Sequence, residues 1–314
     1  MRFRCSECGK VFPLSTFKWQ CECGGAFSLE GRSLFNPSLI EGKDTTLWRY
    51  RAVLPVCKEE NIVSMGEGFT PLVKSGWDGL PVYFKLEFLA PTGSFKDRGT
   101  SVLVSFLKEM GVKEVVEDSS GNAGASLAAY AARAGIKAHI YVPARASPAK
   151  RAQIAVYGAH LVPVEGPREK AAEAVREAAE KGFYYASHYY NPLILEGMKT
   201  AAYEIWEQLG GPPHNIVLPV GHGTFLLGLY MGFCDLLEAG LISRLPHLFG
   251  VQALACAPLY EAFQQGRDDL PEEALGSGER KLTVAEGISI VRPVRAREVL
   301  KAIRDTGGRI VAVE

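Results

Sequence analysis

The sequence predicts an α/β protein with parallel sheets and a separate small unit at its N-terminus. Short apolar runs alternate with longer helical patterns beyond residue 33, and such alternation is typical of parallel strands with helices on the faces of the sheet. Four of the seven cysteines lie in the first 23 residues, apart from this pattern. Three glycine-containing loops also join an expected strand to an expected helix, where α/β proteins bind their ligands.

The strands are expected where β-branched and aromatic residues form short runs. In chain order these runs are 82–87 "VYFKLE", 113–117 "KEVVE", 136–142 "IKAHIYV", 159–164 "AHLVPV", 183–186 "FYYA", 215–220 "NIVLPV", 248–253 "LFGVQA" and 309–313 "RIVAV". Helices are expected where apolar residues recur at helical spacing between these runs. They cover 97–110, 122–134, 147–157, 168–181, 196–209, 225–239 and 296–305.

Length and charge limit the classes of function. The 314 residues are enough for two domains, and 35 basic residues balance 35 acidic ones. Without a net positive charge there is no general field for nucleic acid, so any anion must be bound locally. The uncharged stretch Ile216–Cys234 is long enough to span a membrane, but Pro219 and the sequence Gly221-His222-Gly223 divide it. We therefore expect a soluble, cytoplasmic protein that has no signal peptide and binds neither nucleic acid nor membrane.

The N-terminal cysteines predict a structural zinc site. Cys5 and Cys8 form a Cys-x-x-Cys pair, Cys21 and Cys23 form a Cys-x-Cys pair, and twelve residues separate the pairs. This spacing suits four thiolate ligands, and a zinc site closed by four ligands folds a segment that is too small for its own core. Two disulfides are the alternative, but nothing else indicates an oxidising compartment. Residues 1–33 are therefore expected to form a zinc ribbon.

The loop "PVGHGTFLLG" (219–228) predicts a phosphate site. Its glycines let backbone N–H groups converge at the start of the following helix, where the helix dipole favours an anion. A dinucleotide-binding loop would need a third glycine where this chain has Leu226, and an acidic residue at the end of the next strand. A small monophosphate therefore fits this loop better than a dinucleotide.

The loop "EDSSGNAG" (117–124) brings polar groups to the start of another helix. Ser119, Ser120 and Asn122 supply hydroxyl and amide groups there, which suits the carboxylate of a substrate. An ordinary helix cap is the alternative, because serine and asparagine are favoured caps.

The loop "PTGSFKDRG" (91–99) places a lysine at the start of a helix. If Ser94 caps this helix, Lys96 lies in the first turn, where the helix dipole disfavours an ammonium group and apolar Leu89 and Phe95 exclude water. Both effects lower the pKa of the lysine and favour its reaction with an aldehyde. The alternative is a solvated first turn of a surface helix. A phosphate site, a carboxylate site and an activated lysine together describe pyridoxal 5′-phosphate (PLP) bound as a Schiff base.

These motifs, in this order, resemble those of the fold-type II PLP enzymes, which include threonine synthase, the serine and threonine dehydratases and cysteine synthase. The cysteine segment and "NPLILEGMKT" (191–200) are similar to threonine synthases, and the resemblance covers the whole chain. It implies a two-domain α/β fold like that of the tryptophan synthase β subunit. The expected division is a zinc ribbon at 1–33, a large PLP-binding domain from 34–98 and 186–314, and a small α/β domain at 99–185.

The resemblance also implies roles for individual residues. Lys96 holds the cofactor and moves protons during catalysis. The remaining assignments are Asn122, Gly221, His222, Gly223 and Thr224 for the cofactor, Ser119, Ser120 and Gly121 for the substrate, and Cys5, Cys8, Cys21 and Cys23 for zinc. Family members act on small amino acids and are homodimers or larger homo-oligomers.

The activity that the resemblance favours is threonine synthase, which converts O-phospho-L-homoserine and water to L-threonine and phosphate. Many threonine synthases carry an arginine for the substrate phosphate where this chain has Ile194, so a serine/threonine ammonia-lyase or a cysteine synthase-like β-replacement enzyme is the alternative. The chain also ends at Glu314, where relatives continue with another helix and strand and a residue facing the pyridine nitrogen. It is therefore expected to be short at this end or incomplete, and an inactive homologue with a binding role is a further alternative.

Overall fold

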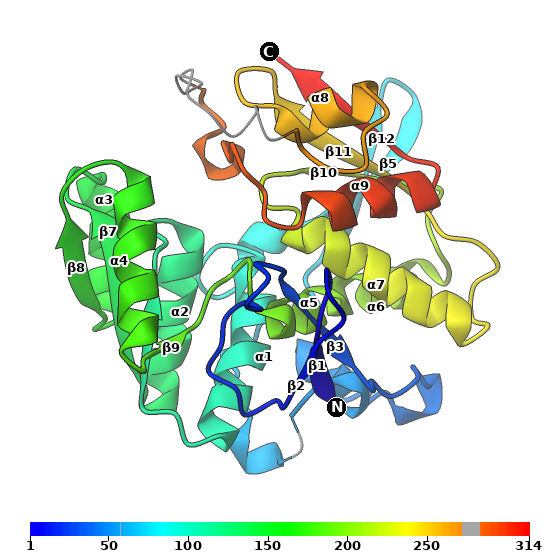
Figure 1. Cartoon of the computed structure of the whole chain (residues 1–314). Coiled ribbons are helices and arrows are strands. Elements are labelled where there is room, and N and C mark those ends of the chain that lie inside the picture. Colours follow the sequence, from blue (N-terminus) through cyan, green and yellow to red (C-terminus); the bar gives the residue numbers. More distant parts are fainter. Residues whose placement is uncertain (57, 272–282) are drawn as a thin grey trace. The chain divides into compact units, whose positions relative to one another are not determined.

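The computed structural model describes residues 1–56, 58–271 and 283–314, which divide into two compact units (Figure 1). The first unit is Met1–Gly197 and the second is Met198–Glu314. Each unit contains a parallel sheet with helices packed on it, which confirms the predicted α/β class. The predicted domain boundaries at 33, 98 and 185 remain a prediction.

The first unit begins with a small antiparallel sheet in the order β2-β1-β3. Its strands are β1 (Arg2–Cys5), β2 (Val11–Phe12) and β3 (Phe27–Glu30). The ring of Phe27 lies 6.0 Å from that of Phe3 and 4.9 Å from that of Phe12, centroid to centroid. These three aromatic rings therefore pack together in the core of this segment.

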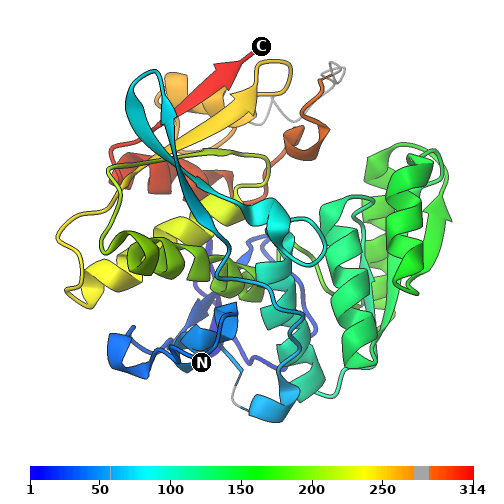
Figure 2. The same cartoon turned by 180° about the vertical axis from the view of Figure 1, so that it is seen from behind.

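The main sheet of the first unit is parallel, with strand order β8-β7-β6-β9. The strands are β6 (Glu114–Glu117), β7 (Lys137–Pro143), β8 (His160–Val164) and β9 (Tyr184–Tyr185), and the connecting helices are α2 (Asn122–Ala134), α3 (Pro148–Val156) and α4 (Arg168–Glu180). Helices α2 and α3 cover one face and α4 covers the other (Figures 1 and 2), as right-handed crossovers require. The chain moves outward from β6 to β8 and returns to β9 on the other side of β6. The strand order therefore reverses between β6 and β9, which is where open α/β sheets bind ligands.

A two-stranded hairpin and two further α-helices complete the first unit. The hairpin consists of β4 (Leu72–Trp77) and β5 (Leu80–Lys85). The helices are α1 (Lys96–Glu109) and α5 (Pro192–Met198), and the last residue of α5 belongs to the second unit. Short 3-10 helices cover Pro37–Leu39, Leu47–Val53, Glu59–Asn61 and Glu87–Leu89. Asp78 and Gly79 join the two strands, and both have positive φ, as a type I′ hairpin turn requires.

The second unit contains a parallel sheet in the order β10-β11-β12. Its elements are α6 (Thr200–Leu209), β10 (Asn215–Pro219), α7 (Thr224–Glu238), β11 (His247–Ala253), α8 (Pro258–Gln264), a 3-10 helix at Glu286–Ile288, α9 (Ala296–Asp305) and β12 (Arg309–Val313). The uncharged stretch Ile216–Cys234 is divided as predicted, because β10 ends at Pro219 and α7 begins at Thr224. Within the described residues, no helix is both long enough and apolar enough to cross a membrane.

The predicted strands and helices agree with these elements to within a few residues, with three exceptions. The helix expected over 196–209 is two helices, α5 and α6, which meet at Lys199. Strands β1 to β4 and helix α8 were not predicted. The strand expected at 183–186 is paired only over Tyr184–Tyr185, next to β6.

Candidate active site

The turn before Lys96 is held by buried polar groups. One carboxylate oxygen of Asp97 accepts hydrogen bonds from the hydroxyls of Thr92 (2.5 Å) and Ser126 (2.7 Å), and the other accepts from the backbone N–H of Thr92 (2.7 Å). Asp97 and Arg98 have no exposed surface. The alternative of a solvated first turn is therefore wrong, because the charged side chains of this turn face the interior.

Arg98 anchors the start of α1 to a neighbouring segment. Its Nε and Nη2 atoms each donate to one carboxylate oxygen of Glu87, at 2.7 Å. This two-point geometry suits a planar guanidinium and fixes direction as well as distance. The backbone that carries Lys96 is thus fixed from both sides, by Asp97 toward α2 and by Arg98 toward the 3-10 helix at Glu87–Leu89.

Lys96 is half-buried, and its Nζ lies 4.2 Å from the centroid of the Phe95 ring. Burial lowers the pKa of Lys96 to about 8; the negative charge of Glu117 opposes this, and the positive charge of Arg168 adds to it. A substantial fraction of this amine is therefore neutral near pH 8, and the neutral form is the one that attacks an aldehyde.

Ser94 does not cap α1, contrary to the expectation. The N-cap residue is Phe95, and no side chain of the described residues makes a capping hydrogen bond there. The Ser94 hydroxyl is buried and has no hydrogen-bond partner within the part of the chain that the structure describes. A buried hydroxyl without a partner is unusual, and it indicates a place where a bound group can donate or accept a hydrogen bond.

The loop after β6 leads directly into α2. The N-cap residue of α2 is Gly121, and none of the described side chains caps the helix. Ser119 instead accepts a hydrogen bond from the backbone N–H of Gly121 within the loop, at 3.3 Å. The ordinary-cap alternative for this loop is therefore wrong, and the first-turn N–H groups of α2 are left to an anion or to water.

Gly124 explains how close the loop and the helix come. A Cβ atom at this position would lie 1.9 Å from the carbonyl oxygen of Ser119. Only glycine permits this approach without moving the backbone. Three of the predicted polar residues lie at the start of α2. Ser119 is buried, Ser120 is half-buried and Asn122 is exposed.

The loops after β6 and β9 bring together two acidic residues and a histidine. Oε1 of Glu117 lies 2.7 Å from Nδ1 of His188, and both residues are buried. Asp118 accepts hydrogen bonds from the hydroxyls of Tyr185 (2.7 Å) and Tyr189 (3.3 Å). Burial, together with the charge of Asp118, raises the pKa of Glu117 well above its usual value. These carboxylates lie where the strand order reverses between β6 and β9, which is where open α/β sheets bind ligands.

The second unit holds the glycine loop at the start of α7. Gly223 is the N-cap residue and has a φ of 81°, a left-handed conformation that favours glycine. A Cβ there would lie 2.3 Å from Val299 of α9, and the described residues provide no side-chain cap. Thr224, the first residue of α7, is buried. Convergent N–H groups at the start of a 15-residue helix fit a phosphate.

The four N-terminal cysteines gather into one cluster. Their sulfur atoms all lie within 4.8 Å of one another, and all four are free thiols. The Cys5 and Cys23 sulfurs are 3.4 Å apart and those of Cys8 and Cys21 are 3.5 Å apart, which is beyond the length of a disulfide. Four thiols converging on one point have the chemistry of a tetrahedral zinc site.

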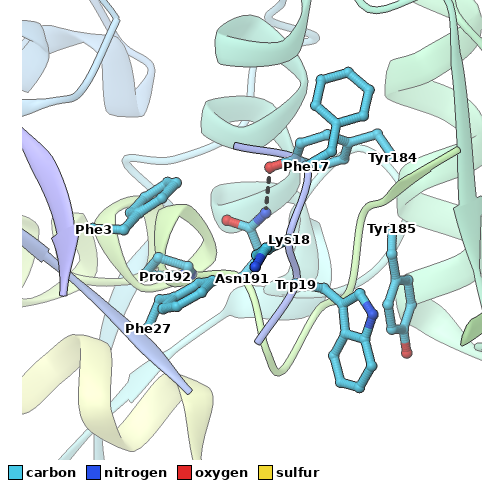
Figure 3. A pocket seen from close by; sticks show the side chains of 9 residues that line it. All are labelled: Phe3, Phe17, Lys18, Trp19, Phe27, Tyr184, Tyr185, Asn191 and Pro192. Atoms are coloured by element: carbon cyan, nitrogen blue, oxygen red, sulfur yellow. Dashed lines mark hydrogen bonds between the residues drawn. The ribbon is translucent and has the colours of Figure 1, made fainter. Parts of the chain in front are cut away.

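The cysteine segment packs against the loop that follows β9 (Figure 3). Phe17 packs edge-on against Tyr184 with ring centroids 5.3 Å apart, and Trp19 packs against Tyr190 at 4.7 Å. The amide of Asn191 donates to the Tyr184 hydroxyl at 2.9 Å. The cavity left among these residues is only about 10 Å³, enough for at most one water molecule. This region is therefore a packed interface rather than a ligand site.

Comparison with known proteins identifies the family. A family model described as pyridoxal-phosphate dependent enzyme matches residues 63–314. A threonine synthase of Methanocaldococcus jannaschii is 36% identical over 323 residues, which cover 99% of this chain and 78% of that protein. A threonine synthase of Methanosarcina acetivorans is 34% identical with the same coverage. Among solved structures, a threonine deaminase from T.th. matches with a TM-score of 0.64 and 26% identity, over 78% of this chain and 76% of that one.

The chain therefore belongs to the pyridoxal-phosphate dependent enzyme family, as its motifs predicted. It is a PLP-dependent lyase, and its similarity to threonine synthases extends over almost its whole length. The match to a solved enzyme also confirms the predicted fold-type II architecture.

Proposed function

We propose that this protein is a threonine synthase, which converts O-phospho-L-homoserine and water to L-threonine and phosphate. The observation that carries the proposal is the half-buried amine of Lys96, whose pKa is lowered to about 8 on a firmly held helix start. The near full-length similarity to two threonine synthases supports this particular reaction over others of the family.

PLP fits the residues that the sequence assigned to it. Bound PLP supplies an aldehyde that condenses with amines and a ring that delocalises the electron pair left when a Cα proton is removed. Lys96 and Asn122 are the residues that would hold its aldehyde and ring. The N–H groups of Gly221, His222, Gly223 and Thr224 would hold a phosphate, since the start of α7 is left without a side-chain cap by the described residues.

The remaining residues bind the substrate and move its protons. The backbone and hydroxyl groups of Ser119, Ser120 and Gly121 bind the substrate carboxylate at the start of α2. Lys96, with its amine free, would take the Cα proton and then the Cβ proton of the substrate. Phosphate would leave from Cγ, water would add at Cβ, and protons would return to Cγ and Cα. Such proton transfer contributes about 10²–10⁴-fold to a rate.

Ammonia elimination from serine or threonine is the second candidate, and one residue favours it. Ile194 occupies the position where many threonine synthases have an arginine for the substrate phosphate. It is buried, and a Cβ on Gly99 would lie only 2.8 Å from its Cγ2 atom, so its side chain faces α1. A threonine synthase reaction in this chain would therefore need another cation for that phosphate, whereas an ammonia-lyase needs none.

One experiment separates these candidates. The full-length protein is loaded with PLP, reduced with borohydride and mapped by peptide mass spectrometry, and a pyridoxyl group is expected on Lys96. O-phosphohomoserine, threonine and O-acetylserine are then supplied separately. Phosphate and threonine from the first substrate support the threonine synthase, and ammonia from the second supports the lyase. Cysteine formed from the third substrate, when sulfide is supplied with it, supports β-replacement.

The variant Lys96→Ala should lose turnover completely, whereas Lys108→Ala, on the same helix, should keep it. Near-normal turnover in Lys96→Ala would overturn the mechanism. A protein that neither reacts with any of the three substrates nor binds PLP would instead favour the inactive homologue with a binding role.

We further propose that Cys5, Cys8, Cys21 and Cys23 bind a structural zinc ion. The four free sulfurs within 4.8 Å of one another support this. Because four thiolates leave no open position on the metal, the ion would stabilise the fold and take no part in the reaction.

A further inference from the structure

A pair of histidines lies at one end of the parallel sheet of the first unit. His139 is the third residue of β7, and His160 is the first residue of β8, the outermost strand of the order β8-β7-β6-β9. The two residues are direct partners in the register of these strands. Because parallel strands begin at the same edge of a sheet, the pair lies at the amino ends of the strands, whereas the candidate ligand loops follow the carboxyl ends.

The two imidazole rings approach each other through one nitrogen each. Nδ1 of His139 lies 3.2 Å from Nδ1 of His160, and the ring planes are nearly perpendicular, at 88°. Imidazole nitrogens lie about 2.0–2.1 Å from a tetrahedral zinc ion, so two such ligands are about 3.3–3.4 Å apart. The two nitrogens are therefore already close to the spacing that a single metal ion requires.

Glu114 determines which nitrogen of His139 is available. It is the first residue of the neighbouring strand β6, and its Oε2 lies 2.9 Å from Nε2 of His139. The hydrogen bond from His139 lowers the pKa of Glu114, so the group that accepts it is a carboxylate. Because a carboxylate only accepts hydrogen bonds, Nε2 of neutral His139 carries the proton and Nδ1 carries the lone pair. Metal-binding histidines almost always donate their other N–H to such an acceptor.

The surroundings hold one ring and leave the other accessible. Phe183 packs edge-on against His139 with ring centroids 5.7 Å apart, and the side chain of His139 is 23% exposed. His160 is exposed, so its proton can move from Nδ1 to Nε2 through solvent. Within residues 1–56, 58–271 and 283–314, no third metal-binding side chain converges on the two nitrogens. Water therefore has to complete the coordination, and such a site binds its ion reversibly.

We propose that His139 and His160 form a metal site, separate from the cysteine cluster, that binds a divalent transition-metal ion such as Zn²⁺ through both Nδ1 atoms. Glu114 orients His139 for this role. Imidazole nitrogens suit zinc, copper and nickel, whereas calcium and magnesium prefer oxygen ligands. The neutral pair loses no proton on binding, since the proton on Nδ1 of His160 moves to Nε2. The ion joins the edge strand β8 to β7 and stabilises the folded chain increasingly as its concentration rises.

The test counts zinc ions per chain. The full-length protein is loaded with zinc, dialysed against metal-free buffer to remove weakly held ions, and then equilibrated with increasing Zn²⁺ at neutral pH. Plasma mass spectrometry measures the uptake. Wild type should bind one more ion per chain than either His160→Ala or His139→Ala. His214→Ala is the matched control, because it removes an exposed histidine outside this sheet, and it should bind as wild type does.

Glu114→Gln tests the role of the carboxylate. The variant keeps the size of the side chain and removes the charge behind His139, so it should weaken binding of the additional ion by about 10–100-fold. Glu173→Gln removes an exposed carboxylate from α4 and should leave the affinity unchanged. Thermal unfolding gives a second measurement, in which added Zn²⁺ should raise the midpoint of wild type more than that of His160→Ala.

The outcomes are decisive without any measurement of activity. Equal zinc uptake by wild type, His160→Ala and His139→Ala would overturn the site, and an equal loss in His214→Ala would show adventitious surface binding only. Unchanged affinity in Glu114→Gln would overturn the role of Glu114. The cysteine cluster is common to all these variants and cancels in the comparison. The result also needs neither PLP nor turnover, so it does not depend on the proposed function.

Discussion

The ring of Trp19 packs edge-on against Tyr185, with centroids 5.8 Å apart, and the hydroxyl of Tyr185 donates to Asp118 at 2.7 Å. Trp19 lies between the two cysteine pairs, and Asp118 begins the loop that leads from β6 to α2. One tyrosine thus joins the cysteine cluster to the acidic residues of the candidate active site. A change in the cluster should therefore affect that loop.

Removal of the proposed zinc ion should destabilise the protein. Chelation, or Cys8→Ser with Cys21→Ser, should lower the thermal midpoint by several degrees, because the 1–30 segment has little apolar core to replace the metal bonds. Zinc content by plasma mass spectrometry and calorimetric unfolding measure this. Cys256→Ser, outside the cluster, should change neither. Protein purified without zinc and unaffected by chelator would contradict the zinc proposal.

The free energy of unfolding should depend on pH because the pKa of Lys96 is lowered in the folded protein. Its pKa is about 8 in the folded protein and 10.5 ordinarily, so between these values the unfolded chain binds more protons and stability rises with pH. Below pH 8 the full cost of the buried ammonium remains. Lys96→Met should therefore stabilise the cofactor-free protein at pH 7 by about 2–3 kcal/mol, and the difference from wild type should vanish near pH 10.5. Urea unfolding at several pH values measures it, with Lys108→Met as the control. A difference that does not change with pH would rule out a lowered pKa.

Gly124→Ala should disturb the loop that is proposed to bind the substrate carboxylate. The added methyl group would lie 1.9 Å from the Ser119 carbonyl oxygen, so the loop or α2 must move. We expect a loss of about 2–3 kcal/mol in stability and a higher KM. Gly76→Ala meets no atom within 4 Å and should have little effect on either. Wild-type behaviour of Gly124→Ala in urea unfolding and in kinetics would show that the contact is not tight.

The pair of the buried Arg98 and the half-buried Glu87 should be costly to break. Arg98→Met leaves a carboxylate without its partner and should cost about 3–5 kcal/mol, with weaker cofactor binding as the start of α1 loosens. Lys170→Met breaks the exposed pair with Glu173 on α4 and should cost less than about 1 kcal/mol. Similar costs for both variants in denaturant unfolding would contradict the burial of the Arg98 pair.

Local patterns account for what could be predicted. The alternation of apolar runs predicted most strands and helices to within a few residues, because hydrophobic periodicity and turn residues are local features of the sequence. Strand β4 was missed although its signal is present, since Asp78-Gly79 is a typical type I′ hairpin sequence. Helix α8 has only seven residues, which is too short for a clear period.

The charged network at β6 could not be predicted in the same way. Glu117 and His188 are 71 positions apart in the chain, and no local pattern of the sequence pairs them. Asp97 and Arg98 looked like residues of a solvated helix start because charged side chains usually are.

By itself, then, the sequence determined the α/β class, the three ligand loops, the cysteine cluster and the family, because each is a pattern of neighbouring residues. Only the tertiary structure decided which charged groups are buried, which partners they have and hence how the pKa values of Lys96 and Glu117 shift. These properties depend on segments that meet only when the chain folds, and on the exclusion of water that follows.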